Sequence, residues 1–446
     1  MREPSLNDAP MQTATDAGWH PSRYNVWARI PDDPQRRFAV ANLYRGSFGV
    51  YTPLGLAALS MLDTLPATHP SVERLAERGI IVNFDERAAI ASLVQKGCKS
   101  VKTVSLVVCP TLGCNFDCPY CFEDHHNVRM SSETQNDVVA LVERMLEASD
   151  ARELFVTWYG GEPLLALDIV DALSQRFINL SENRGTTYSS KMVTNGYLLS
   201  PEAVETLEQS RISVVQVTLD GLGDAHNVTR HLADGRDTFD CIVANLSRPG
   251  LPFAVDVRHN LYGGNSDTSE ELRAFVQHLA DESSNNITFY ASLVNDTQTA
   301  RQRGQQVDIL DGQRASDSML SSVNLPTGVR PIHCGAPNPW EVTIDPKGRL
   351  HKCWENVDKP DFSFGNARDW DPGDAWETAS RPDFLTCYLN CTSPPDDDEC
   401  TECLWLPICA GGCPQRRLFG PGRQCIAHKD DPSGYALALW RKEQAR

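Results

Sequence analysis

Three closely spaced cysteines are the residues with the clearest potential for metal chemistry. Cys114, Cys118 and Cys121 have the spacing C-x3-C-x2-C. Three thiolates on one short loop can hold three irons of a [4Fe–4S] cube and leave the fourth iron open to another ligand. A closed zinc site would need a fourth protein ligand. The triplet therefore favours an open iron that can do chemistry, with a zinc loop as the alternative.

Besides Cys387 and Cys391, seven further cysteines lie in the last third of the chain. They are Cys334, Cys353, Cys400, Cys403, Cys409, Cys413 and Cys425. The N-terminal segment lacks the apolar core of a signal peptide, and the fifteen cysteines are an odd number, so metal or cluster ligands are favoured over disulfides. Pairs with C-x2-C spacing also occur in zinc sites, so zinc knuckles are the alternative here.

Alternating strand and helix patterns must position the first three cysteines. Apolar runs predict strands at 104–108, 154–158, 191–194, 214–219, 253–258 and 287–291, and the segments between them predict helices at 132–147, 167–180, 201–209, 238–246 and 269–279. A capping box of Ser132 and Gln135 is expected to begin the first helix. Such alternation predicts a parallel sheet, here an open six-unit barrel with its chemistry at the C-terminal strand ends.

Short polar motifs follow several of the predicted strands. They are Gly160-Gly161-Glu162-Pro163, Thr194-Asn195-Gly196, Asp220-Gly221 and Arg258. Glycines let a backbone approach a ligand closely, and a carboxylate suits an ammonium group. Ordinary strand-end turns are the alternative for the second and third motifs, and a structural salt bridge is the alternative for Arg258.

The cysteine triplet with Tyr120 resembles the radical S-adenosylmethionine (SAM) signature, C-x3-C-x-aromatic-C. The resemblance implies that SAM chelates the open iron and is cleaved reductively to a 5′-deoxyadenosyl radical, which abstracts hydrogen from a substrate. It also implies that Glu162 and the backbone of its motif meet the SAM amino group. The residues expected near SAM or substrate are Tyr120, Gly160, Gly161, Glu162, Pro163, Thr194, Asn195, Asp220 and Arg258. Asp220, His226 and Arg230 are similar to the substrate-side loop of peptide-modifying members.

The seven later cysteines resemble the SPASM pattern, in which two auxiliary [4Fe–4S] clusters are bound. The resemblance implies an outer cluster held by Cys400, Cys403, Cys409 and Cys425, and an inner cluster held by Cys334, Cys353 and Cys413. Some relatives place a fourth inner ligand just before the first cysteine, but residues 325–333 contain none. Either Cys387 or Cys391 takes that place, or the inner cluster keeps an open iron.

SPASM proteins mostly modify peptides or proteins, which leaves two activities open. One is maturation of a ribosomally made precursor peptide by a crosslink, epimerisation or another C–H modification. The other is conversion of a sulfatase Cys or Ser to formylglycine. Sulfatase-maturating relatives carry an aspartate base directly after the second SPASM cysteine, where this chain has Trp354 and then Glu355. A base must reach its proton, so the tryptophan favours the peptide activity. An iron–sulfur electron carrier is the alternative of another class.

We therefore expect an α/β protein with three parts. These are an N-terminal α+β module at 1–100, a partial (β/α)6 radical SAM barrel at 101–325 and a SPASM domain at 326–446. The first module is expected to be winged-helix-like and to bind a leader peptide by strand addition, or else to cap the barrel. The polar stretch 295–330 is interpreted as a linker or surface loop.

Composition narrows the expected partners. The net charge of −18 argues against nucleic acid, because phosphate binding requires a basic face. No segment approaches the roughly 20 apolar residues of a membrane helix. We expect a cytoplasmic protein that takes electrons from a flavodoxin or ferredoxin and binds a precursor peptide.

Overall fold

The computed structural model describes residues 18–99, 102–294, 307, 308, 310, 328–330, 334–390, 398–420 and 422–444. The chain divides into two compact units, of which one contains 1–100, 324–334 and 391–446, and the other contains 101–323 and 335–390. In this division 335–390 groups with the barrel, and the expected three parts stay a prediction. The predicted linker at 295–330 lies largely outside the described residues.

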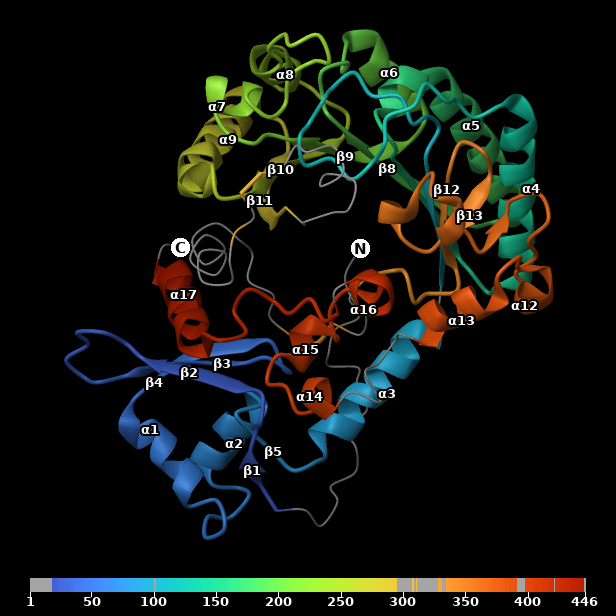
Figure 1. Ribbon diagram of the computed structural model, residues 1–446. Coiled ribbons are helices and arrows are strands. Elements are labelled where there is room, and N and C mark those ends of the chain that lie inside the picture. The colour runs from blue at the N-terminus through green and yellow to red at the C-terminus, as the bar shows by residue number, and fades with distance from the viewer. Residues whose placement is uncertain are drawn as a thin grey trace. The chain divides into compact units, whose positions relative to one another are not determined.

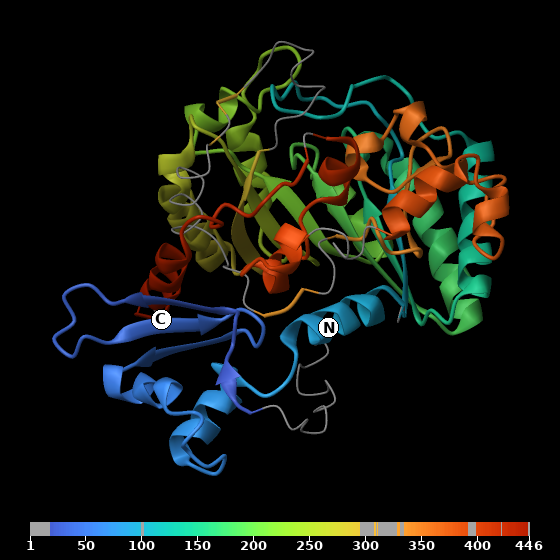
Figure 2. The same cartoon turned by 60° about the horizontal axis from the view of Figure 1, so that its bottom comes forward.

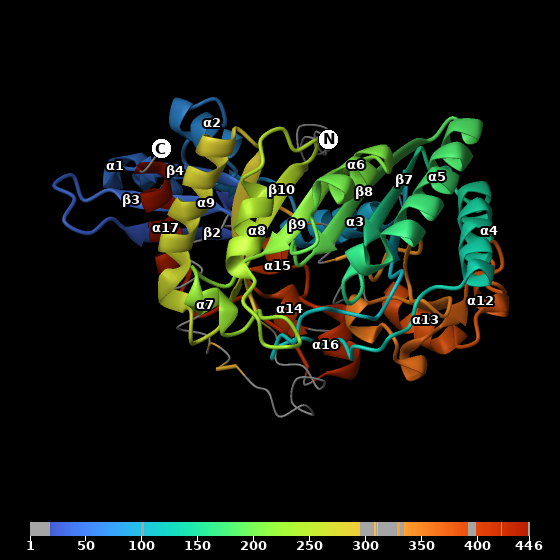
Figure 3. The ribbon, with the colours of Figure 1, turned by 90° about the horizontal axis from the view of Figure 1, so that it is seen from above.

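Six parallel strands form the centre of the larger unit. They are β6 (Thr103–Val108), β7 (Glu153–Trp158), β8 (Thr187–Thr194), β9 (Ile212–Thr218), β10 (Ala254–Leu261) and β11 (Ile287–Leu293), and they neighbour one another in chain order. The connecting helices are α4 (Ser132–Ala148), α5 (Leu167–Arg184), α6 (Pro201–Gln209), α8 (Phe239–Leu246) and α9 (Ser269–Ser283), with a short α7 (Asp224–Asn227) before α8. These helices lie along one side of the strands (Figures 1 and 3). The predicted parallel α/β core is thereby confirmed.

The strands bury one face fully and the other only in part. In β7, Leu154, Val156 and Trp158 are buried against the helices, and the Trp158 ring stacks on Phe177 of α5 with 6.4 Å between centroids. Phe155, on the opposite face of β7, is only half-buried. Parallel sheets are normally covered on both faces. The half-covered inner face is therefore the side on which a ligand can be accommodated.

The start of α4 differs from the predicted capping box. Ser131, not Ser132, is the N-cap, and its Oγ accepts a hydrogen bond from the Thr134 amide at 3.1 Å. Ser131 has the extended backbone of an N-cap, with φ of −69° and ψ of 160°. The third residue after Ser131 is a threonine and not the Glu or Gln of a capping box, and Gln135 bonds instead to the Met130 carbonyl.

Three later strands extend the barrel sheet. β12 (Glu341–Ile344) pairs in parallel with β6, and β13 (Arg349–His351) and β14 (Gly365–Asn366) follow in antiparallel pairing. The short helices α12 (Ala375–Thr378) and α13 (Pro382–Asn390) complete this region. Because Ile344 lies beside Val108, the hairpin is packed against the strand that leads to the three cysteines.

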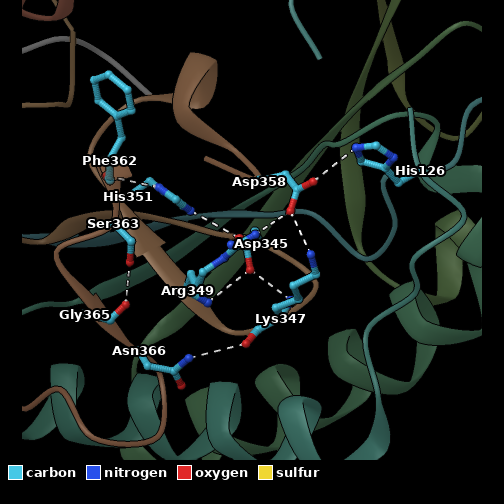
Figure 4. Close-up of polar contacts among 10 residues, drawn as sticks. All are labelled: His126, Asp345, Lys347, Arg349, His351, Asp358, Phe362, Ser363, Gly365 and Asn366. Carbon is cyan, nitrogen blue, oxygen red and sulfur yellow. Dashed lines mark hydrogen bonds and ion pairs between the residues drawn. The ribbon is translucent and has the colours of Figure 1, made fainter. Parts of the chain in front are cut away.

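A buried carboxylate holds the β12–β13 hairpin together (Figure 4). Asp345 accepts hydrogen bonds from Arg349 Nε at 2.6 Å and from His351 Nε2 at 3.3 Å. Arg349 also pairs with Asp358, and Asp358 lies 3.6 Å from His126 Nε2 on the segment after the three cysteines. This ionic network therefore joins the hairpin to that segment.

The smaller unit combines an N-terminal sheet with C-terminal helices. Its antiparallel strands are β2 (Asn25–Arg29), β3 (Phe38–Asn42) and β4 (Ser47–Tyr51), and β1 (His20–Pro21) pairs with β5 (Ile81–Val82). Its helices are α1 (Pro53–Ala57), α2 (Pro70–Glu77), α3 (Glu86–Lys99), α14 (Asp398–Thr401), α15 (Leu406–Cys409), α16 (Pro414–Phe419) and α17 (Pro432–Gln444). α17 packs against β2 (Figure 2). The sequence did not predict α3. No described helix is both long and apolar enough to cross a membrane.

We predict that Asp345→Asn destabilises the larger unit in a pH-dependent way. Burial acts to raise the pKa of Asp345, but the hydrogen bond from His351 and the charges of His351 and Arg349 outweigh it and lower the pKa. The carboxylate thus contributes stability above its unfolded pKa, and this contribution is lost as pH falls through the lower folded value. The variant should lose about 3 kcal/mol of unfolding free energy at neutral pH.

Urea denaturation followed by circular dichroism measures this difference. The gap between wild type and variant should narrow between about pH 5 and pH 3. Glu133→Gln, which removes an exposed pair with Arg368, is the matched control and should cost at most about 1 kcal/mol. A pH-independent gap would contradict the assignment.

Candidate active site

The three cysteines lie on the loop between β6 and α4, where the first barrel strand ends. Cys118 is buried, and Cys114 and Cys121 are half-buried. Burial raises the pKa of the Cys114 thiol, and the negative charges of Glu162, Cys118 and Cys121 raise it further. Cys121 Sγ also lies 3.4 Å from His125 Nε2. Such buried thiols give up their protons to a strong partner such as iron, so this donor set fits a cluster.

The glycine turn after β7 lies directly against the cysteine loop. The Gly161 amide donates to the Thr111 carbonyl at 3.3 Å, and the Glu162 amide donates to the Gly113 carbonyl at 2.8 Å. A Cβ on Gly161 would lie 2.4 Å from the Gly113 oxygen, and one on Gly160, whose φ is +117°, would lie 2.4 Å from the Thr111 oxygen. The backbone of the cysteine loop therefore requires both glycines. From the sequence, the same glycines were expected to let the backbone approach a bound ligand.

The Glu162 carboxylate connects the ends of two neighbouring strands. It accepts hydrogen bonds from Thr194 Oγ1 and the Asn195 amide, each at 2.7 Å, and from the Leu164 amide at 3.0 Å. Burial raises the pKa of Glu162, and these hydrogen bonds act against that rise. Pro163 begins the helical turn 163–166, which this carboxylate caps. The structure thus brings four predicted residues together and gives Glu162 an orienting role.

The cysteine loop is also bonded to the segment at 231–233. The Asp117 amide donates to the His231 carbonyl at 3.3 Å, and the Ala233 amide donates to the Asn115 carbonyl at 2.9 Å. Asn195 Nδ2 reaches Asn115 Oδ1 at 2.7 Å from the other side. Both flanks of the loop are therefore fixed, one by the predicted residue Asn195 and the other by the 231–233 segment, which no sequence motif indicated.

The Tyr120 hydroxyl joins two more strand ends to the cysteine loop. It donates to the Asp220 carboxylate and accepts from Arg230 Nη1 at 2.9 Å and from Asn260 Nδ2 at 3.2 Å. Arg258 Nε donates to Asn260 Oδ1 at 2.8 Å, so the predicted residues Tyr120, Asp220 and Arg258 lie in one network. Arg258 thus bonds a neutral amide here and not the carboxylate of a salt bridge.

The Asp220, His226 and Arg230 pattern faces the cysteine loop. Buried His226 accepts from the Asp220 amide at 3.3 Å and so fixes the turn, and the Arg230 guanidinium lies 5.5 Å from the centroid of the Phe116 ring. Asp220 Oδ1 and Arg230 Nε are buried and have no hydrogen-bond partner among the described residues. Buried polar atoms are normally paired. An unpaired acceptor and donor beside the cysteines suit a ligand with an amino and a carboxylate group, as SAM has.

Four later cysteines line one pocket in the smaller unit, namely Cys400, Cys403, Cys409 and Cys425. Burial raises the pKa of Cys409 to about 11, and the negative charges of the other three thiols contribute. Gly412, with a φ of +79°, has no room for a Cβ, because the Gln424 carbonyl oxygen would lie 2.6 Å away. This close approach brings the residue before Cys425 next to the segment that follows Cys409.

The other predicted cluster ligands are distributed differently. Cys353 belongs to the larger unit, and Cys334 and Cys413 belong to the smaller one. Cys387 is exposed on α13, and Cys391 lies outside the described residues. Among the residues that the structure describes, no three His, Cys, Asp or Glu side chains form a group that could hold a metal ion. The assignment of cysteines to particular clusters therefore stays a prediction.

A column of aromatic side chains leads from the cysteine loop to the inner face of the sheet. Phe122 stacks on Tyr159 with 6.4 Å between centroids, and Tyr159 lies 4.7 Å from Trp354. Lys191 Nζ lies 5.9 Å from the Trp354 ring centroid. These residues come from four separate segments, and the only signal in the sequence was the position of Trp354 directly after Cys353.

Comparison with known families and sequences agrees with this geometry. Residues 108–279 match the model of the radical SAM superfamily. A cysteine-type anaerobic sulfatase-maturating enzyme of Clostridium perfringens is 25% identical over 365 residues, which cover 74% of this chain and 91% of that protein. The mycofactocin maturase MftC of Mycolicibacterium smegmatis is 25% identical over 371 residues, which cover 75% and 84%.

Solved structures support the same fold. The enzyme anSMEcpe, solved with AdoMet and the Cp18Cys peptide, has a TM-score of 0.56 at 17% identity and covers 76% of this chain and 98% of its own. SuiB of Streptococcus suis has a TM-score of 0.51 at 14% identity and covers 93% and 99%. At these identities the similarity concerns the fold alone.

We predict that Gly161→Ala prevents the cysteine loop from holding its cluster, because the added Cβ would clash with the Gly113 carbonyl. After anaerobic reconstitution the variant should contain about four fewer iron atoms per chain than the wild type, as determined by a colorimetric iron assay. Gly373→Ala, where the nearest atom would lie 3.2 Å from the new Cβ, is the control and should keep its iron. A full iron content in Gly161→Ala would show that the loop tolerates displacement.

We also predict that Tyr120→Phe lowers the free energy of unfolding by about 2–3 kcal/mol, because the change removes a hydroxyl shared by two buried charged groups. Urea denaturation provides the measurement. The matched control is Tyr188→Phe, which loses a 3.4 Å bond to the neutral Ser174 hydroxyl and should cost about 1 kcal/mol. Equal losses in the two variants would argue against the network.

Proposed function

Residues 108–279 form a radical SAM domain, and from this premise we propose that the protein is a peptide maturase. In this proposal it abstracts hydrogen from a residue of a ribosomally made precursor peptide and forms a crosslink or another C–H modification. Its homologues include maturases that act on peptides and proteins. These relatives support an enzyme of the maturase type, and the precursor peptide is the proposed substrate.

The observation that carries the proposal is the arrangement around the cysteine loop. Cys114, Cys118 and Cys121 would hold a [4Fe–4S] cluster, and this cluster with SAM supplies a 5′-deoxyadenosyl radical when bound. The unpaired atoms of Asp220 and Arg230 would bind the polar groups of SAM. Glu162 fixes the adjoining strand ends through Thr194 and Asn195, so the loop is held in place while substrate enters.

A peptide substrate is supported by the relatives and by the N-terminal sheet. One further relative, from Gluconobacter oxydans, is named as a PqqA peptide cyclase and is 23% identical over 288 residues. β4 is an outer strand of the β2–β3–β4 sheet, and such an edge can pair with an extended leader peptide. We therefore assign leader binding to residues 20–95 as part of the proposal.

Conversion of a sulfatase residue to formylglycine is the second candidate. It is favoured by the similarity to the Clostridium perfringens enzyme, which extends over 91% of that protein. It is disfavoured at Trp354, where an indole packs on Tyr159 in place of the aspartate expected from the family resemblance. An indole accepts no proton at neutral pH.

The remaining components of the proposal follow the cysteine pattern. The pocket lined by Cys400, Cys403, Cys409 and Cys425 would hold an outer auxiliary cluster, and Cys334, Cys353 and Cys413 would hold an inner one. A flavodoxin or ferredoxin would deliver electrons, and the reaction would take place in the cytoplasm.

The experiment is anaerobic turnover with SAM and dithionite. The wild type should form 5′-deoxyadenosine, and a Cys114→Ala, Cys118→Ala, Cys121→Ala variant should form at least about 100-fold less, because no cluster can be held. Cys241→Ala is the control, since this half-buried thiol on α8 lies outside every cysteine motif. Intact SAM in the wild type would identify an electron carrier and overturn the proposal.

Mass spectrometry then separates the two maturase activities. Peptides encoded by short reading frames beside the gene, and a sulfatase-derived peptide with the target Cys, are incubated with the same preparation. A loss of two hydrogens from a precursor peptide, or the gain of one deuterium at a residue epimerised in D2O, supports the proposal. Formylglycine in the sulfatase peptide alone would support the second candidate.

A further inference from the structure

The Lys191 ammonium occupies an unusual position on the inner face of the sheet. Lys191 lies on β8, and its Nζ is 5.8 Å from the Phe155 ring centroid and 5.9 Å from the Trp354 ring centroid. No hydrogen bond or ion pair links this ammonium to another described residue, although its aromatic neighbours provide cation–π attraction. Its three N–H donors are therefore available to a ligand.

Two carboxylates near Lys191 influence its charge without binding it. Burial lowers the pKa of Lys191, and the charges of Glu341 and Asp256 act in the opposite direction. Asp256 already accepts a hydrogen bond from Thr288 Oγ1 at 2.6 Å. The Glu341 carboxylate also interacts electrostatically with the Lys352 ammonium. These groups favour the charged form of Lys191, but neither lies within ion-pair distance of it.

The side chains around Lys191 are only partly covered. Lys191, Phe155 and Trp354 are each half-buried, whereas the neighbours of Lys191 on the opposite face of β8, Ser190 and Met192, are fully buried. Through Trp354, Tyr159 and Phe122 the ammonium is connected to the residue that follows Cys121. A group bound by Lys191 would therefore lie on the same inner face to which the cysteine loop leads.

We propose that Lys191 binds the carboxylate of an Asp or Glu side chain of the peptide substrate, between the rings of Phe155 and Trp354. This inference rests on the proposed function, because it specifies the side chain that the maturase accepts. An ammonium–carboxylate hydrogen bond is charge-assisted and roughly twice as strong as a neutral one. Lys191 is then a determinant of substrate specificity that no motif of the sequence indicated.

The test uses two synthetic pentapeptides, Ac-Ala-Ala-Glu-Ala-Ala-NH2 and its Gln counterpart, with the reconstituted holoenzyme and SAM. Calorimetric titration should give about tenfold tighter binding of the Glu peptide by the wild type. In Lys191→Met this preference should disappear. Lys191→Arg should still bind the Glu peptide at least about fivefold more tightly than the Gln peptide. Lys102→Met, at an exposed lysine, is the control and should keep the preference.

The possible results distinguish a failure of the Lys191 inference from a failure of the proposed function. Equal binding of the two peptides by the wild type, or an unchanged preference in Lys191→Met, would overturn the inference. Iron content and the thermal midpoint of each variant show that it is folded. A wild type that prefers the Glu peptide but forms no 5′-deoxyadenosine would instead overturn the proposed function and leave the Lys191 site standing.

Discussion

The site depends on the absence of side chains at Gly160 and Gly161. Any Cβ there would enter the space of the Thr111 and Gly113 carbonyls, so the turn after β7 and the cysteine loop can approach only as bare backbone. This contact sets the position of Cys114, and it also sets the Glu162 carboxylate that joins the next strand. A cluster, a cofactor and a substrate would all be positioned relative to this one contact between two backbones.

Much of this arrangement could be predicted because its signals are local in sequence. Apolar runs followed by turns indicated each of the six barrel strands, and in a parallel sheet their C-terminal ends must meet at one edge. The motifs at Glu162, Thr194 and Asp220 were therefore expected to converge, and they do. The predicted N-cap was wrong by one residue. Ser131 and Ser132 are both serines, and only the backbone conformation distinguishes them.

Other features depend on the tertiary fold and left no sequence signal. The Tyr120 hydroxyl forms hydrogen bonds with Asp220, Arg230 and Asn260, which lie at least a hundred residues from Tyr120 in the chain. The separation of 335–390 from 391–446 likewise depends on the tertiary fold, since β12 pairs with β6 of the barrel whereas α17 packs against β2. A spacing pattern of cysteines cannot show that its members belong to different compact units.

The two ends of the chain are bound to each other within the smaller unit. Arg23 and Arg87 both pair with Glu402, next to Cys403, and α17 packs against β2 and β3. The N-terminal strands and the C-terminal helix therefore share one packed interface. Without the N-terminal strands, the side of α17 that packs against β2 would be exposed to solvent, so each end of the unit buries apolar surface of the other.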